Sequence, residues 1–136
     1  MAYEGRQYYE GVGRRKRATA RVRIYIDPES TGSFMVNGKD VTDFFPRFGD
    51  HTILSGPLAD TEMMSKVDVT VLVNGGGVTG QTSAVRLGLA RALVKYDENM
   101  RSALRAKGHL TRDARIKERK KPGLKRARKA PTYTKR

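Results

Sequence analysis

The sequence contains no cysteine and only two histidines among its 136 residues. The absence of cysteine excludes disulfides and thiolate metal sites, and it favours a reducing compartment. His51 and His109 stand far apart, and an isolated histidine is more often structural or solvated than a metal ligand. No nucleophile, base and orienting residue occur together in a recognisable arrangement. We therefore expect a protein that is not an enzyme, with no catalytic residue, metal or cofactor.

Long apolar segments are also missing from the chain. No run approaches the ~20 apolar residues that span a bilayer. Residues 1–11 lack the basic-then-apolar order of a signal peptide. The length favours a single domain with a modest core. These features predict a soluble, cytoplasmic protein without a membrane partner.

Acidic residues are scarce at both ends of the chain. Residues 1–23 hold seven basic and two acidic residues (+5), residues 24–111 hold nine and ten (−1), and residues 112–136 hold twelve and two (+10). The net charge of +14 therefore resides in the two ends, and such density attracts polyanions. The last segment has too few apolar residues to offset its ordering entropy alone. We expect it to become ordered only on a negatively charged partner.

Hydrophobic periodicity predicts a small mixed sheet packed against helices. Alternation is clearest over residues 22–26 and 67–73, which predicts strands, and helical spacing of apolar residues predicts a helix over 80–96. The other predicted elements are strands at 7–13 and 33–36, a helical turn at 42–45, a helix at 98–107, and a loop over residues 49–60. The expected fold class is α+β, with a globular domain over residues 1–111 and a long basic extended tail over residues 112–136.

The stretch after the clearest strand contains two nucleotide-binding patterns. Gly75, Gly77 and Gly80 match G-x-G-x-x-G, and a phosphate-loop pattern also fits except that Gln81 replaces its lysine. Without that lysine, and without room for a second parallel strand, a nucleotide cofactor is disfavoured. The glycines permit a tight strand-to-helix turn, whose N–H groups are able to receive a nucleic acid phosphate. The candidate phosphate-contacting residues are Gly76, Gly77, Gly80 and Gln81.

Basic residues near both ends form the candidate nucleic-acid interface. Arginine suits bidentate phosphate contacts, lysine supplies a point charge, and a tyrosine can stack on a base. A nuclear import signal and an anionic membrane patch also fit a basic tail, although apolar anchors for a membrane are lacking. Charge alone does not separate RNA from DNA. The candidate RNA-binding residues are Arg14, Arg15, Lys16, Arg17, Arg21, Arg23, Arg119, Lys120, Lys121, Lys125, Arg126, Arg128, Lys129 and Tyr133.

Four motifs, in order, resemble the family of ribosomal small-subunit protein nine. They are GVGRRKRATARVRI, VNGKDVTDFF, VNGGGVTGQTSAVRLGLARAL and the ending LTRDARIKERKKPGLKRARKAPTYTKR. The motifs cover most of the chain, and residues 46–66 are the least typical stretch. One departure lies at Thr132-Tyr133-Thr134, where the family pattern has Gln, an aromatic residue and Ser.

This resemblance implies a fold, a place and partners. Members are small α+β proteins, similar to a domain of another small-subunit ribosomal protein, and they bind the 3′ major (head) domain of small-subunit ribosomal RNA among neighbouring head proteins. Their tail extends towards the tRNA in the peptidyl site. Carried onto this sequence, Lys135 and Arg136 become the candidate tRNA contacts, reaching the anticodon stem-loop. A general DNA-packaging protein remains the main alternative, and a nucleotide-dependent enzyme the third.

Overall fold

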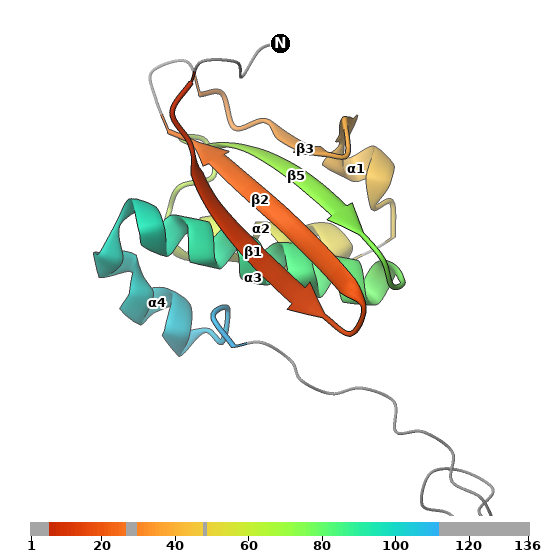
Figure 1. The fold of residues 1–136 in the computed structure, drawn as a ribbon. Coiled ribbons are helices and arrows are strands. Elements are labelled where there is room, and N and C mark those ends of the chain that lie inside the picture. The colour runs from red at the N-terminus through yellow and green to blue at the C-terminus, as the bar shows by residue number, and fades with distance from the viewer. Residues whose placement is uncertain (1–5, 27–29, 48, 112–136) are drawn as a thin grey trace, which may run out of the picture.

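The computed structural model describes residues 6–26, 30–47 and 49–111, which form two layers. One layer is a five-stranded sheet in the order β1-β2-β5-β3-β4, and helices form the other (Figure 1). The predicted α+β fold class, a small mixed sheet packed against helices, is thus confirmed for the described residues. The strands are β1 Tyr9–Arg15, β2 Ala18–Tyr25, β3 Phe34–Val36, β4 Lys39–Asp40 and β5 Asp68–Asn74.

The sheet is mixed and has one buried face. β2 pairs antiparallel with both β1 and β5, whereas β3 pairs parallel with β5 and antiparallel with β4. Along β2, Val22 and Ile24 are fully buried, whereas Arg21, which points to the opposite face of the sheet, is exposed. This period of two is the one read from the sequence, and it directs the apolar side chains towards the helices.

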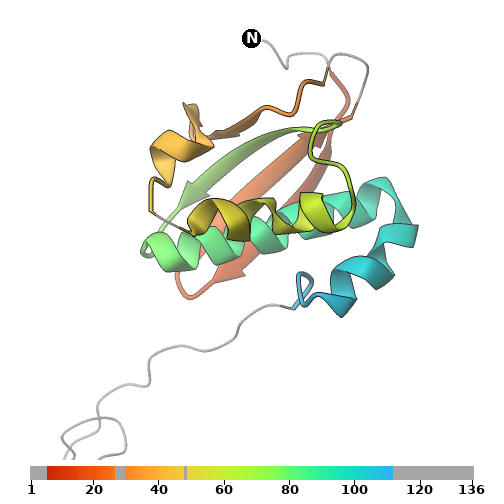
Figure 2. The same ribbon diagram turned by 180° about the vertical axis from the view of Figure 1, so that it is seen from behind.

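Two helices cover one face of the sheet, as the view from behind shows (Figure 2). They are α2, Asp50–Asp60, and the long α3, Val78–Tyr96. A short α1, Val41–Phe44, lies near β3, and a 3-10 turn, Glu98–Met100, leads into α4, Arg101–Ala106. None of the helices in the described ranges combines the length and apolar character needed to cross a bilayer.

The loop predicted over residues 49–60 is wrong, because residues 50–60 form α2. Gly56 and Pro57 lower the intrinsic helix preference of this stretch. Tertiary packing overrides that preference: Leu54 and Leu58 are almost completely buried in the common core. Pro57 itself is buried within the helix, and its carbonyl oxygen accepts a hydrogen bond from the Thr61 hydroxyl at 2.8 Å.

Glycines bring α3 unusually close to β1. A Cβ atom on Gly13 would overlap the carbonyl oxygen of Ala84 and lie 2.5 Å from the backbone nitrogen of Gly88. Gly11 is similarly restricted by the next turn of α3, since its Cβ would lie 2.6 Å from the nitrogen of Ala92. Gly11 and Gly13 therefore allow the backbone of β1 to contact the backbone of α3, which any larger residue would prevent. This contact fixes where α3 begins relative to the β1–β2 turn.

Candidate nucleic-acid interface

The tight β1–β2 turn presents the first group of predicted RNA-binding residues. Lys16 has a φ of +54° and forms the turn with Arg17 between the paired residues Arg15 and Ala18. Arg14, Lys16 and Arg17 are exposed at the end of the hairpin. Arg15 is half-buried and donates a hydrogen bond to the Ser83 hydroxyl of α3 at 2.6 Å. Three of the four cations therefore face solvent, and the fourth ties the hairpin to α3.

The glycine turn after β5 packs against the same hairpin. Gly75 and Gly76 have φ values of +76° and +65°, which strongly favour glycine. A Cβ on Gly75 would meet the carbonyl oxygen of Arg17, and one on Gly76 would lie 3.1 Å from the nitrogen of Ala18. Two segments that are far apart in the sequence thus form one corner of the molecule. Predicted separately, the basic turn and the glycine turn are brought together by the fold.

The N-terminus of α3 opens at this corner. Gly77, the residue before the helix, has no side chain to cap it, and residues 75–79 are exposed. Gln81 donates its backbone N–H to the Gly77 carbonyl at 2.9 Å, and its side-chain amide bonds the Gly75 carbonyl at 3.2 Å. Gly80 is buried against the hairpin. The chemistry offered here is a helix start with positive partial charge beside exposed cations, which favours an anion.

Arg47 joins this corner, and sequence reasoning missed it. Its guanidinium donates to the Thr79 hydroxyl at 3.2 Å and to the buried Asp50 carboxylate at 2.9 Å. Thr79 is the second residue of α3, so the Arg47–Asp50 ion pair lies beside the helix start. Its place after Pro46, in a stretch without periodicity, gives no sequence signal for such a role.

Arg21 and Arg23 lie on the uncovered face of the sheet, where both contact Glu10. Arg21 Nε lies 3.1 Å from Glu10 Oε1, and Arg23 Nε lies 3.2 Å from Oε2. The Arg21 and Arg23 side chains remain 53% and 36% exposed. One carboxylate thus holds two of the predicted RNA-binding arginines side by side. Glu10 carries no signal for this role in the sequence, because its pairing depends on the register of β1 and β2.

The Glu10 carboxylate is kept ionised by these arginines. Partial burial raises the pKa of Glu10, but hydrogen bonds and charge attraction from Arg21 and Arg23 outweigh it, so the pKa lies below its ordinary value. For Arg23, burial lowers the pKa while the bond to Glu10 raises it, and the net shift is upwards. At neutral pH the three residues form a charged cluster with a net charge of about +1.

The remaining predicted contacts lie outside the described residues. These are Arg119, Lys120, Lys121, Lys125, Arg126, Arg128, Lys129, Tyr133, Lys135 and Arg136.

The last described segment is fixed to the body by a histidine. After α4, Gly108 has a φ of +77° and the His109 N–H bonds the Leu104 carbonyl at 3.0 Å. His109 is buried, and its Nε2 lies 2.5 Å from Asp60 Oδ2 at the end of α2. His109 is therefore structural. Among residues 6–26, 30–47 and 49–111, no group of three or more His, Cys, Asp or Glu side chains is placed to hold a metal.

The nucleotide-binding patterns at residues 75–82 gain no support from this geometry. In a phosphate loop, the Ser/Thr hydroxyl faces Mg²⁺, whereas Thr82 is buried and its hydroxyl bonds the Thr79 carbonyl at 2.9 Å. The side chain of Gln81, in the place of the lysine, folds back onto Gly75. β5 is followed by α3 but pairs antiparallel with β2, unlike the parallel pairs of a dinucleotide fold.

Comparison with known proteins gives consistent matches over nearly the whole chain. The model of the family described as ribosomal protein S9/S16 matches residues 13–136. The small ribosomal subunit protein uS9 of Dehalococcoides mccartyi strain CBDB1 is 49% identical over 133 residues, which cover 98% of each chain. The protein of the same name from strain BAV1 is 48% identical over the same share.

Proposed function

Because the chain belongs to the ribosomal protein S9/S16 family, we propose that it binds the 3′ major (head) domain of small-subunit ribosomal RNA in the cytoplasm. As a family member it is a structural protein of the small ribosomal subunit with a role in translation, and not an enzyme.

The body holds RNA through the corner where the β1–β2 turn meets the start of α3. The observation that carries this is the convergence of exposed Arg14, Lys16 and Arg17 with the uncapped helix start at Gly77. Backbone N–H groups at such a start bind phosphate well, and arginines add bidentate contacts. Gly76 packs closely against Ala18 of the hairpin, Gly80 lies in ordinary contact with it, and Gly77 leaves the helix start open, while Gln81 braces the turn. The guanidinium of Arg47, paired with Asp50, borders the same site.

The tail forms the second part of the interface. Residues 1–111 act as the globular RNA-binding domain, and residues 112–136, with a charge of +10, act as an extension ordered by RNA. Arg119, Lys120, Lys121, Lys125, Arg126, Arg128 and Lys129 neutralise phosphates along its course, and Tyr133 stacks on a base. Lys135 and Arg136 reach the anticodon stem-loop of the tRNA in the peptidyl site. Neighbouring head proteins complete the surroundings.

The test is deletion of Lys135 and Arg136 from the full chain. Subunits assembled with the shortened protein should form normally but retain peptidyl-site tRNA less well, because the body and the rest of the tail keep their RNA contacts. Lys66→Gln with Lys95→Gln removes the same charge from the exposed body and serves as the control. If the deletion instead prevents incorporation of the protein into the subunit, this division between body and tail is wrong.

A further inference from the structure

The face of the sheet opposite the helices is open in the described structure (Figure 1). The strand pairing places both charged and apolar side chains on this face. The pairing registers arrange these side chains in rows across the strands. One row joins Glu10, Arg23 and Thr70, and the next joins Val12, Arg21 and Leu72. Leu72 is 61% exposed at the centre of the sheet. Arg14, one row further on, is also exposed. The registers also place Asp68, which is buried beside Arg6, and Asp40 of the far strand β4 on this face, so the exposed arginines gather on β1 and β2.

Tyr8 stands at one end of this face and is held in place by its neighbours. The guanidinium carbon of Arg23 lies 4.4 Å from the centre of the Tyr8 ring. The Tyr25 ring centre lies 6.0 Å away, tilted by 56°. Arg23 is itself fixed by Glu10. The ring is thus oriented before any partner arrives, yet 43% of the Tyr8 surface remains exposed.

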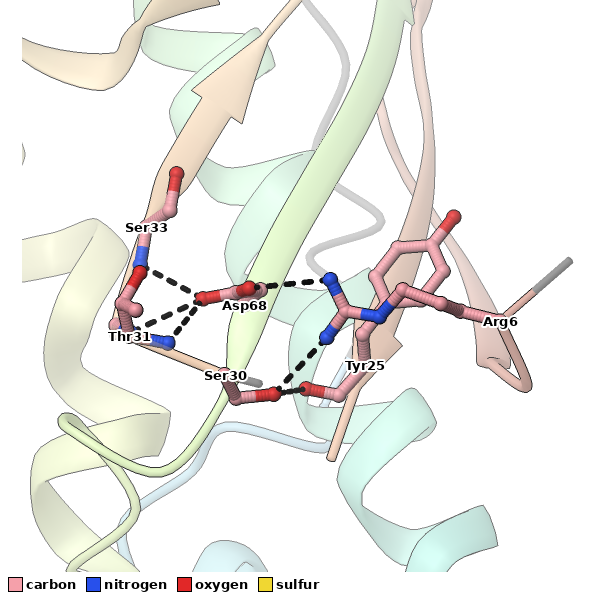
Figure 3. A network of polar contacts seen from close by, with 7 residues as sticks. Arg6, Tyr25, Ser30, Thr31, Ser33 and Asp68 are labelled. Carbon is pink, nitrogen blue, oxygen red and sulfur yellow. Dashed lines mark hydrogen bonds and ion pairs between the residues drawn. The ribbon is translucent and has the colours of Figure 1, made fainter. Parts of the chain in front are cut away.

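The chain on both sides of Tyr8 is anchored. On one side, Arg6 reaches the buried carboxylate of Asp68, which also accepts backbone N–H bonds from residues 31–33 at 2.9–3.0 Å (Figure 3). The same guanidinium lies over the Tyr25 ring at 5.2 Å. On the other side, Tyr9 turns towards the helices and packs edge-on against Tyr96 at 5.4 Å. Tyr8 therefore has little freedom to withdraw from the open face.

We propose that the open face binds an unpaired stretch of RNA, with one base stacked on the exposed part of Tyr8. The inference rests on the proposed ribosomal RNA partner and names the feature of that RNA which this face accepts. A fixed aromatic ring provides a stacking surface at low entropic cost, and every base has a π-face to offer. Arg23 beneath the ring supplies a cation–π contact. Arg21 and Arg14 continue along the face at positions suited to the phosphates that follow the stacked base.

A purely structural role for Tyr8 predicts different behaviour. As a cover for Arg23 and Tyr25, it would contribute to the stability of the fold and leave RNA affinity untouched. A protein neighbour seated over Leu72 is the other occupant to distinguish. Stacking contributes through the base and not through counterion release, so its loss weakens binding equally at every salt concentration.

The first experiment measures binding of the full chain to transcribed small-subunit ribosomal RNA across a salt series. We expect Tyr8→Leu to weaken binding roughly 5- to 150-fold without changing the slope of affinity against salt. Ile53→Ala is the control, because Ile53 is 40% exposed on α2 and its truncation removes apolar surface on the helical side of the sheet. Unchanged affinity for the Tyr8 variant would overturn the proposal.

The second experiment does not depend on Tyr8→Leu, so it remains valid if that variant is unstable. The chain contains no tryptophan, so Tyr8→Trp introduces a single fluorescent reporter at the proposed stacking site. RNA binding should quench it, whereas Tyr96→Trp should not respond. A Tyr8 reporter that stays bright while RNA binds tightly would overturn the stacking. Intact RNA affinity with impaired subunit incorporation of Tyr8→Leu would assign the face to a protein, and absence of RNA preference in the wild-type chain would overturn the proposed function itself.

Discussion

Replacing Glu10 with glutamine should tighten RNA binding while slightly weakening the fold. The carboxylate accepts from Arg21 at 3.1 Å and from Arg23 at 3.2 Å, so it competes with phosphates for both guanidinium groups. Glu10→Gln removes that competition together with one negative charge. The substitution should therefore raise RNA affinity while lowering the free energy of unfolding, whereas general damage to the protein would lower both.

The magnitude follows from counterion release. One additional neutralised phosphate steepens the salt dependence by about 0.7 to 0.9 in the logarithmic slope. That slope corresponds to binding about 5- to 8-fold tighter at ~0.1 M salt, with the difference vanishing near ~1 M. Partly exposed ion pairs contribute on the order of 0.2–1 kcal/mol each, so the variant should remain folded.

The assay is a salt series of RNA affinities for the wild type, Glu10→Gln and Glu62→Gln. Glu62 is exposed just after α2, on the helical side. Its substitution therefore changes the net charge by the same amount but away from the open face. If both variants tighten binding by the same factor, only the net charge matters. That result, or a weakened Glu10→Gln variant, would refute a role for the open face in RNA binding.

The pH dependence of stability provides a second check on the same residue. Because the arginines hold the pKa of Glu10 below its ordinary value of 4.5, its ion pairs stabilise the fold fully above that pH. This contribution is lost as the pH falls through the lowered pKa. The difference in unfolding free energy between wild type and Glu10→Gln should therefore be constant near neutrality and shrink in acid. A difference that grows on acidification would contradict the assigned cause.

Two further predictions concern the framework behind the interface. Gly13→Ala should destabilise the protein by about 3 kcal/mol or more in urea unfolding, because its Cβ would overlap the Ala84 carbonyl. Gly77→Ala, where a Cβ meets no atom within 4 Å, should change stability by less than about 0.5 kcal/mol. Replacing His109 and Asp60 with alanine, singly and together, should show a coupling of about 0.5–3 kcal/mol. Additive losses would mean that the two side chains do not act as a pair.

Strong periodicity explains which parts of the fold the sequence predicts. The alternating valines of β5 and the apolar stripe of α3 each bury one face, so pattern and structure agree. α2 is not predictable from the local sequence, because Gly56 and Pro57 lower the intrinsic helix propensity of this stretch. Its packing involves residues far along the chain: a Cβ on Gly56 would lie 3.0 Å from the His109 ring. Such a constraint cannot be inferred from a local pattern.

The candidate site was predictable in its parts and not in its assembly. The basic turn and the glycine turn carry recognisable residues, but their meeting depends on the pairing of β2 with β5, in which Thr19 lies opposite Asn74. Arg47 enters the site from an irregular segment. Tyr8 and Glu10 gain their roles only from exposure and cross-strand neighbours. The role of such side chains depends on the face of the sheet on which the strand register places them.

The most direct test of RNA recognition is competitive binding of the full chain to small-subunit ribosomal RNA and to random-sequence DNA across added salt. Contacts with phosphates alone weaken steeply, by about 10³–10⁵ for 6–10 contacts between 50 and 200 mM salt on B-DNA. We predict that a marked preference for the ribosomal RNA persists at the higher salt, because the folded body recognises a shaped site. If the affinities for RNA and DNA collapse together, the chain binds only as a polycation and the proposed interface is wrong.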